Sequence, residues 1–311
     1  MKDEHLKEAL RRTQNFLLSS QQPDGTWKGL VESDPRPTAF YLITVRLLER
    51  GPDERTRQME LYLSSKQLSS GAWQAWPEGP PDRDVTATCE IALQIADTEC
   101  GRKARIRAQK WLSSQPLPGR DSFWQGLLAL NGDLSWGDLP YLSPRLISNP
   151  SWLHPNIYDF SFLRIAIVSA SLMQAHPLGS REPIASCEQS RMSDEIPEFA
   201  DWKRRWIATC RLPVGGSASF ACRVMRIVDS VLPTARHSRA ALEWLLAHQE
   251  SDGSFFSSVH MTSIAILALH KVDARQFRAR IEAGLEAMHN WQVMDGHRRK
   301  QQFTDSTNCC G

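Results

Sequence analysis

Carboxylate, imidazole and thiol side chains are the groups with which this 311-residue chain could build an acid, a metal site or a nucleophile. The tightest carboxylate pair is Asp82 and Asp84, with Arg83 between them, in a proline-rich connection. A neighbouring arginine favours ionised carboxylates over a protonated acid, so we expect this segment to be structural. We name no catalytic residue.

Neither metal nor nucleophile chemistry is indicated elsewhere. The 9 histidines form no His-x-x-x-His pair, so we expect no metal and no other cofactor. The 7 cysteines form no Cys-x-x-Cys pair and are typical of reduced cytosolic thiols. Val214–Ser217 lacks the lysine of a phosphate loop, and no Gly-x-Ser-x-Gly motif occurs.

Composition excludes several functional classes. The 37 basic and 35 acidic residues leave a net charge of +2, which gives no basic face for nucleic acid. No apolar run approaches the ~20 residues needed to span a bilayer. The charged N-terminus lacks an apolar signal core, so we expect a cytoplasmic protein, with peripheral contact to the inner membrane as the alternative.

Helical periodicity dominates the chain. Apolar residues recur at three- and four-residue steps in the first segment, at Leu6, Ala9, Leu10, Thr13, Phe16 and Leu17. The same pattern indicates helices at residues 40–49, 54–66, 85–96, 103–113, 123–130, 158–175, 221–231, 238–248, 261–270 and 277–291. We predict an all-α protein of about a dozen helices with little or no sheet.

A repeat links several of these helices to the turns that follow them. An aromatic–Leu pair precedes Gln, Gly and a ring in three copies, which contain Gln21–Gly25–Trp27, Gln67–Gly71–Trp73 and Gln249–Gly253–Phe255. A degenerate copy begins at Trp111. Gln at a helix end can bond unpaired carbonyls, and Gly admits the left-handed backbone that ends a helix. We expect the ring to pack back on the Gln, so that these residues are structural.

The repeat resembles the QW motif of triterpene cyclases, and two further segments resemble squalene–hopene cyclases. These are Trp76–Thr86 and the stretch from Trp136 to Phe160. The resemblance runs from about residue 5 to about residue 290 and implies an α/α barrel, as in the N-terminal half of a full-length cyclase. We predict that residues 1–294 form this domain and that residues 295–311 are a divergent polar tail, produced by a frame change or a natural truncation.

The resemblance also indicates residues that line the substrate cavity: Phe123, Phe162, Leu163, His260 and Met261. Phe123 matches a cavity aromatic of the family. His260 and Met261 stand where the family has a Pro-Pro-Trp run, and Phe162–Leu163 replace a cavity tryptophan. Aromatic faces stabilise cations, so these replacements weaken the case for the same cyclisation.

Three functional hypotheses follow. The first is a squalene–hopene cyclase-like domain in hopanoid biosynthesis, inactive alone because the Asp-x-Asp-Asp acid of the family's second domain is missing. The second is a non-catalytic isoprenoid-binding or remnant module. The β-subunit of a protein prenyltransferase ranks below both, since its zinc ligands are not found. The face left for the second domain would meet a second cyclase half, another copy of the chain or a membrane surface.

Overall fold

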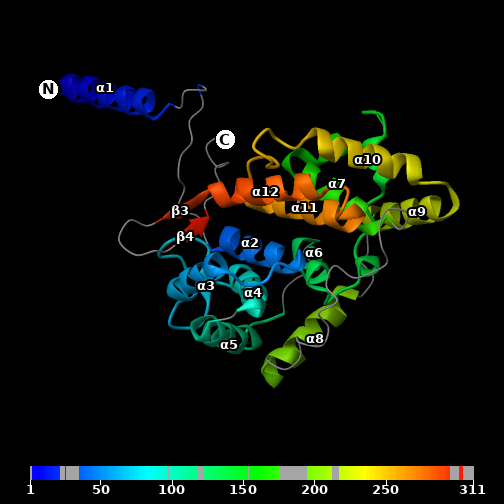
Figure 1. The fold of residues 1–311 in the computed structure, drawn as a ribbon, viewed down its shortest axis with the longest axis horizontal. Coiled ribbons are helices and arrows are strands. Elements are labelled where there is room, and N and C mark those ends of the chain that lie inside the picture. The colour runs from blue at the N-terminus through cyan, green and yellow to red at the C-terminus, as the bar shows by residue number, and fades with distance from the viewer. Residues whose placement is uncertain are drawn as a thin grey trace.

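The structure is a computed structural model that describes residues 2–21, 25, 35–96, 98–117, 122–152, 154–175, 195–211, 217–294 and 301–303. Within these residues it contains twelve α-helices, which confirms the mainly helical prediction (Figure 1). Their bounds are α1 Lys2–Ser20, α2 Arg36–Leu47, α3 Glu54–Lys66, α4 Arg83–Ala92, α5 Glu99–Ser113, α6 Ser122–Asn131, α7 Arg164–Gln174, α8 Pro197–Arg211, α9 Ser217–Val231, α10 Ala235–Ala247, α11 Val259–Asp273 and α12 Arg278–Asn290.

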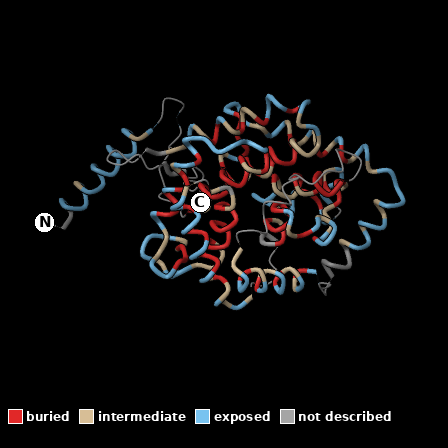
Figure 2. Tube along the Cα trace, turned by 60° about the horizontal axis from the view of Figure 1, so that its bottom comes forward, coloured by how far each residue is buried: buried red, intermediate tan, exposed pale blue. Residues whose placement is uncertain are grey.

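Eight of these helices form two layers. In the inner layer α7, α11, α2 and α4 are neighbours in that order, and each is buried along much of its length. In the outer layer α10 covers α7, α12 covers α11, α3 covers α2 and α5 covers α4. Figure 2 shows the buried residues in the interior of the helical layers and the exposed residues on the outside. This alternation of inner and outer helices is typical of an α/α fold. That the two layers close into a barrel stays a prediction.

Local chemistry fixes the starts of the outer helices. The side chain of Asp53 accepts the backbone N–H of Thr56 at 2.9 Å, and the Thr56 hydroxyl accepts the N–H of Asp53 at 2.8 Å, which is a capping box before α3. At α5 the Thr98 hydroxyl caps the N–H of Gly101 at 3.0 Å. The buried Glu60 accepts both the N–H and the hydroxyl of Thr98, so α3 positions the start of α5.

Other regular structure is short. In the described ranges, four 3-10 helices lie at Leu93–Ile95, Trp136–Asp138, Pro144–Ile147 and Ile157–Leu163. Strands β1 (Trp73–Gln74) and β2 (Pro81–Asp82) form one antiparallel pair. Strands β3 (Gln292–Met294) and β4 (Gln301–Phe303) form another, in which Gln292 pairs with Phe303. Part of the segment predicted as a polar tail therefore returns as a strand that pairs with β3, near α3.

Helix α8 is the one described α-helix that the sequence analysis did not predict. Its buried residues Phe199, Trp202, Trp206 and Cys210 recur at helical spacing, so the periodic signal was present. Trp202 stacks on Phe199 at 5.7 Å between ring centroids and donates its indole N–H to the Gln115 carbonyl at 3.0 Å. These contacts pack α8 against the end of α5.

Helix α1 forms as predicted, but its apolar face is not covered. Leu6 is 59% exposed, Leu10 56% and Phe16 68%. In Figures 1 and 2 the helix stands apart from the two layers.

Candidate functional site

The repeat after α3 is organised by the side-chain amide of Gln67. Its Nε2 donates to the carbonyl oxygens of Gly71 and Ala104, each at 2.8 Å. Ala104 belongs to α5, so a single amide joins the turn after α3 to the next outer helix. Both acceptors lie outside α3, so the amide bonds carbonyls beyond its own helix.

Gly71 shapes the turn rather than capping the helix. Its φ is +92°, and α3 has already ended at Lys66. Within the turn the Leu68 N–H donates to the Ala72 carbonyl at 2.8 Å. A Cβ added at Gly71 would lie 2.6 Å from the carbonyl oxygen of Arg107 in α5. The position therefore requires glycine both for its backbone conformation and for the close approach of α5.

Trp73 connects the turn to two helices. Its ring is fully buried, and its indole N–H donates to the carbonyl of Leu63 in the last turn of α3 at 2.8 Å. Its backbone N–H donates to the hydroxyl of Thr86 in α4 at 2.9 Å. One residue thus holds an outer helix, a turn and an inner helix together, as a structural repeat requires.

The repeat after α10 reproduces this arrangement. The Nε2 of Gln249 donates to the carbonyls of Gly253 at 2.8 Å and Arg280 at 2.9 Å, the latter in α12. Gly253 has a φ of +95°, and a Cβ there would collide with the backbone of Ala283 in α12. The buried Phe255 takes the place of the tryptophan and offers no indole N–H.

A threonine at the start of the following inner helix completes both sites, and the sequence analysis missed it. Thr262 in α11 accepts the N–H of Phe255 at 3.0 Å, as Thr86 accepts that of Trp73. Both threonines are fully buried. A third buried threonine, Thr38, lies in the first turn of α2, after the first repeat copy.

The other copies are less complete. Gln21 donates to the Gly25 carbonyl at 2.8 Å, and Gly25 has a φ of +85°, as in the other repeats. Trp27 lies outside the described residues. In the degenerate copy Gln115 turns back toward the Trp111 carbonyl of its own helix, at 3.5 Å.

The predicted cavity residues divide into two groups. His260, at the start of α11, lies against Phe40 of α2 with ring centroids 4.3 Å apart. Met261 is half-buried beside the core. Phe162 and Leu163, just before α7, are 59% and 42% exposed. These two therefore lie on an open face.

Two further aromatic residues share the segment before α7. Trp152 is 77% exposed and Tyr158 is 63% exposed. Arg164 lies over the Tyr158 ring at 5.5 Å. Phe123 lies on α6, but its side chain is outside the described residues.

The Asp82–Asp84 segment is a helix cap. The Asp82 carboxylate accepts the backbone N–H groups of Asp84 at 2.8 Å and Val85 at 2.9 Å at the start of α4. Asp82 is therefore the N-cap of α4, and its side chain is engaged by the helix backbone. The structural interpretation of the segment fits this geometry.

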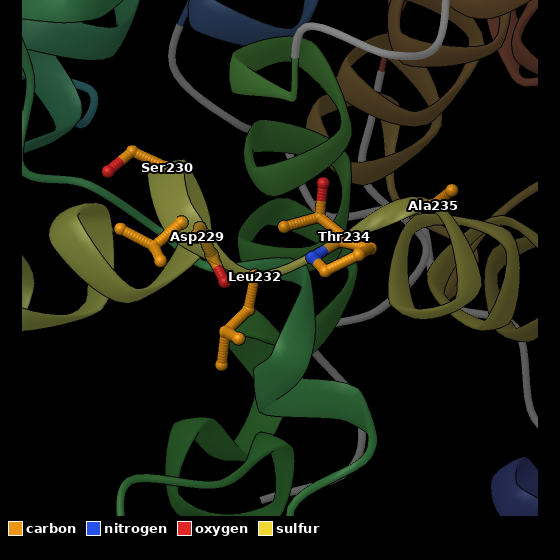
Figure 3. A pocket seen from close by; sticks show the side chains of 7 residues that line it. Asp229, Ser230, Leu232, Thr234 and Ala235 are labelled. Carbon is orange, nitrogen blue, oxygen red and sulfur yellow. The ribbon is translucent and has the colours of Figure 1, made fainter.

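An open hollow lies elsewhere. It is an open depression of ≈ 390 Å³ at the junction of α9 and α10, lined by Asp229, Ser230, Val231, Leu232, Pro233, Thr234 and Ala235 (Figure 3). A second hollow of ≈ 10 Å³ lies between α7 and the Pro144–Ile147 turn and is no larger than about one water molecule. Neither contains a predicted cavity residue.

Asp229 beside the larger hollow is occupied by structural contacts. Its carboxylate accepts from Tyr141 at 2.8 Å, Ser143 at 2.6 Å and Arg145 at 2.5 Å. Burial and then the bond to Asp229 raise the pKa of Tyr141. Arg145 also donates to the Nε2 of His237 at 2.9 Å. This network fixes the α9–α10 junction, and its groups are already partnered.

A second set of charges connects α8 to the layers. Glu90 in α4 accepts from Arg105 in α5 at 3.0 Å, and Arg105 lies 3.9 Å from Glu195. Lys203 in α8 pairs with Glu195 at 3.0 Å and with Asp133 at 2.8 Å. Burial alone would lower the pKa of Lys203, but these carboxylates outweigh it and raise the pKa. The charges alternate and therefore compensate one another.

In the described part of the chain, no group of three or more His, Cys, Asp or Glu side chains could hold a metal ion. No helix in the same residues is long and apolar enough to cross a membrane.

Comparison with known proteins gives a consistent set of relatives. The family described as the squalene-hopene cyclase N-terminal domain matches residues 10–297. A squalene–hopene cyclase from Alicyclobacillus acidocaldarius is 29% identical over 287 residues, which are 89% of this chain and 44% of that protein.

More distant relatives are named for other products. Enfumafungin synthase from Hormonema carpetanum is 26% identical over 96% of this chain and 24% of its own length. Dammaradiene synthase from Dryopteris crassirhizoma is 24% identical over 80% of this chain and 37% of its own length. The chain spans less than half the length of each of these relatives.

Proposed function

We propose that this chain, which belongs to the squalene-hopene cyclase N-terminal domain family, supplies one helical half of a triterpene cyclase that acts on a squalene-type isoprenoid. The observation that carries the proposal is the match over residues 10–297. The Gln67 and Gln249 sites support it, because both build the same junction between turn and outer helix. Squalene, hopene and a role in hopanoid biosynthesis are the specific substrate, product and pathway that we infer.

In this proposal the acid comes from a second domain, on the same polypeptide or on another. The sequence contains no Asp-x-Asp-Asp, and the carboxylate of Asp82 caps α4. A cyclase acid must be held protonated at neutral pH, which requires burial and hydrogen bonds to the neutral form. This half would contribute a wall of the cavity and would be inactive alone.

The open face before α7 supports a docking role. Trp152, Tyr158, Phe162 and Leu163 are all exposed there. Exposed apolar side chains of this size are typical of an interaction surface where they form a contiguous patch. We infer that this face meets the second cyclase half, with Phe162 and Leu163 on the cavity side.

Co-expression tests the proposal. The full chain would be produced with the part of the Alicyclobacillus relative that lies outside the match, and squalene conversion would be followed by gas chromatography. We expect a cyclic product from the pair and none from either part alone. Stable association of the two parts without any cyclic product would overturn the catalytic role.

A non-catalytic isoprenoid-binding or remnant module is the second candidate. The contact between His260 and Phe40 favours it, since a polar ring lies where the family has an apolar cavity run. Binding of squalene to the full chain alone, measured by a rise in melting temperature, would support the binding module. Production of the chain only as aggregate would support the remnant.

We also infer peripheral contact with a membrane through α9. Val224, Ile227 and Val231 are exposed at helical spacing, and Leu232 follows them. Flotation with phosphatidylglycerol vesicles would test this contact. Ile227→Glu and Val231→Glu should each abolish flotation. Flotation of both variants to the same extent as the parent chain would exclude α9.

A further inference from the structure

Helix α9 is held to the rest of the molecule by polar contacts rather than by broad packing. Among the described residues, no other helix or strand packs broadly on α9, and its residues 222–231 are all half-buried or exposed. The carboxylate of Asp229 departs from this pattern, because only 3% of that side chain is exposed. A surface helix therefore buries one of its charges, and that charge marks where the helix is attached.

Asp229 is attached by three donors from one short segment. Its carboxylate accepts from the hydroxyls of Tyr141 at 2.8 Å and Ser143 at 2.6 Å. It also accepts from the guanidinium of Arg145 at 2.5 Å. Hydrogen bonds to an ionised group are about twice as strong as neutral ones, so this cluster is a strong attachment for α9.

A second attachment lies one turn earlier on α9. Arg226 donates to the carbonyls of Gly137 at 3.0 Å and Leu139 at 3.2 Å. Its guanidinium also lies over the ring of Tyr141 at 5.4 Å. Both attachments therefore end on residues 137–145, so a change that loosens the grip of this segment loosens the helix.

The same Arg145 holds the link from α9 to α10. One of its amino groups donates to the carbonyls of Leu232 at 3.3 Å and Pro233 at 3.2 Å, and the other lies 2.9 Å from Nε2 of His237. A guanidinium only donates, so Nε2 must accept, and the neutral ring carries its proton on Nδ1. Nδ1 lies 3.0 Å from the Ser148 hydroxyl. The closed link therefore requires a neutral His237.

Three charged groups surround the His237 ring. They are Arg145 in the 144–147 turn, Arg236 on α10 and Asp229 on α9. Burial, followed by the two guanidinium groups, lowers the pKa of His237 below 6.5, and the carboxylate of Asp229 opposes them with a smaller effect. A proton on Nε2 would point at an N–H of Arg145, so the protonated ring and the closed link exclude each other.

We propose that this junction is a proton-operated latch, in which protonation of His237 displaces Arg145 and frees α9 from residues 137–145. Arg145 then loses its acceptor on the ring, and with it the position from which it bonds Leu232 and Pro233. Residues 231–235 also line the open hollow of ≈ 390 Å³, so the helix can turn there without displacing a packed core (Figure 3).

The direction of the pH effect follows from where the proton binds better. Above pH 6.5 His237 is neutral in the closed and the open state, and the latch is closed. In the open state the ring is solvated and has its ordinary pKa of 6.5. Between 6.5 and the lowered pKa of the closed state, each pH unit therefore favours opening by up to about tenfold.

The consequence for a membrane rests on the contact proposed above for α9. Val224, Ile227 and Val231 are exposed in the closed state, but the bonds of Asp229 fix the angle at which they point. A freed α9 can lie along a bilayer surface with this whole face buried. Flotation with phosphatidylglycerol vesicles should therefore increase between pH 7.5 and pH 5.5.

Hydrogen exchange of the full chain, followed by mass spectrometry and corrected for the intrinsic rate at each pH, tests the latch. From pH 7.5 to pH 5.5 we expect protection of residues 222–231 to fall several-fold, to at most about tenfold, in the parent. It should stay constant in His237→Gln, because the amide oxygen can accept from Arg145 at either pH. His248→Gln is the matched control on α10, since that ring bonds the Trp244 carbonyl of its own helix, and it should behave as the parent does.

The outcomes separate the latch from the membrane contact. An equal loss of protection in the parent and His237→Gln, or no loss in the parent, overturns the latch. A parallel loss in the buried helix α11 also overturns it, since the chain would then unfold as a whole. A loss in α9 that requires His237, with no flotation at either pH, supports the latch and overturns the membrane contact. Greater flotation at pH 5.5 in the parent but not in His237→Gln supports both.

Discussion

Trp73 donates its indole N–H to the backbone carbonyl of Leu63 at 2.8 Å, and both side chains are fully buried in the core. The bond joins the end of α3 to the turn that follows it. Phe255 occupies the same position after α10 with the same burial and without the N–H. The ring is therefore the shared requirement of the repeat, and the hydrogen bond is an addition in one copy.

Trp73→Phe tests what this addition contributes. The variant keeps the ring and removes the donor, so we expect a loss of ~1–2 kcal/mol in the free energy of unfolding. Trp73→Ala should lose about 3–5 kcal/mol, because it also leaves a cavity. Urea unfolding of the full chain provides the measurement. Trp76→Phe is the control, because the Trp76 side chain is 59% exposed. A Trp73→Phe variant as stable as the parent would show that the indole bond contributes nothing.

The three repeat glycines separate backbone strain from close packing. Gly71, Gly253 and Gly25 all have positive φ. Only Gly71 and Gly253 lie against the backbone of another helix, which is α5 for Gly71 and α12 for Gly253. Alanine at Gly25 should cost ~1 kcal/mol for the left-handed conformation. Alanine at Gly71 or Gly253 should cost about 1–3 kcal/mol more, since α5 or α12 must move. Equal losses at all three positions, measured by thermal unfolding, would contradict the packing argument.

Thr86 and Thr262 each accept a buried backbone N–H from the ring residue of the repeat. Valine at either position keeps the shape and leaves that N–H unpaired, so we expect a loss of ~1–3 kcal/mol. Thr44→Val is the matched control, because the buried Thr44 hydroxyl donates within α2 to the Phe40 carbonyl. If the control lost as much stability as Thr86→Val, the assignment of this role would fail.

The repeat also shows what the sequence could and could not predict. Gln and Gly are visible because they stand at a fixed spacing, and the hydrogen bond of Gln67 to Gly71 spans that spacing. The threonines stand 13 residues after Trp73 and 7 after Phe255, so no single motif contains them. The carbonyls in α5 and α12 that accept from the Gln amides are backbone groups, which any residue type supplies. Ala104 and Arg280 therefore carry no sequence signal.

The cavity residues were less predictable for a different reason. Phe162 and Leu163 were inferred from resemblance, and their exposure depends on what lies opposite them. Trp202 and Trp206 recur at helical spacing in α8, so its own residues carry the signal of a helix. Periodicity predicts a helix from its own residues, whereas the partner of a face depends on the rest of the fold.

Stability should fall as the pH drops through the range of the histidines. Burial, followed by the guanidinium groups of Arg145 and Arg236, lowers the pKa of His237 below 6.5. Burial also lowers the pKa values of His270 and His289. Between 6.5 and these lowered values the unfolded chain binds more protons than the folded chain, so stability is lost on acidification.

His237→Gln isolates one contribution to this pH dependence. The Nε2 of His237 lies 2.9 Å from a donor of Arg145 and can accept only while the ring is neutral. We expect a smaller drop in the urea midpoint between pH 7 and pH 5 in His237→Gln than in the parent. His5→Gln on the exposed α1 is the control and should keep the parent's drop. An identical drop in His237→Gln and the parent would rule out this histidine.

The Glu90–Arg105 pair predicts a non-additive result. Both side chains are nearly buried, with 2% and 9% of their surface exposed, and Gln109 also donates to Glu90 at 2.8 Å. Removing one partner leaves a buried charge uncompensated, so Glu90→Leu and Arg105→Met should each lose about 3–5 kcal/mol of unfolding free energy.

The double variant Glu90→Leu/Arg105→Met should lose less than either single change, because two apolar side chains replace the whole pair. Glu195 lies 3.9 Å from Arg105 and would then rely on Lys203 alone, at 3.0 Å. That remaining pair is sufficient to neutralise Glu195, so the double variant should keep α8 in place, with Trp202 still shielded from a fluorescence quencher. A double variant whose loss equals the sum of the two single losses would show that the two charges act independently. That result would contradict the coupling predicted from their 3.0 Å contact.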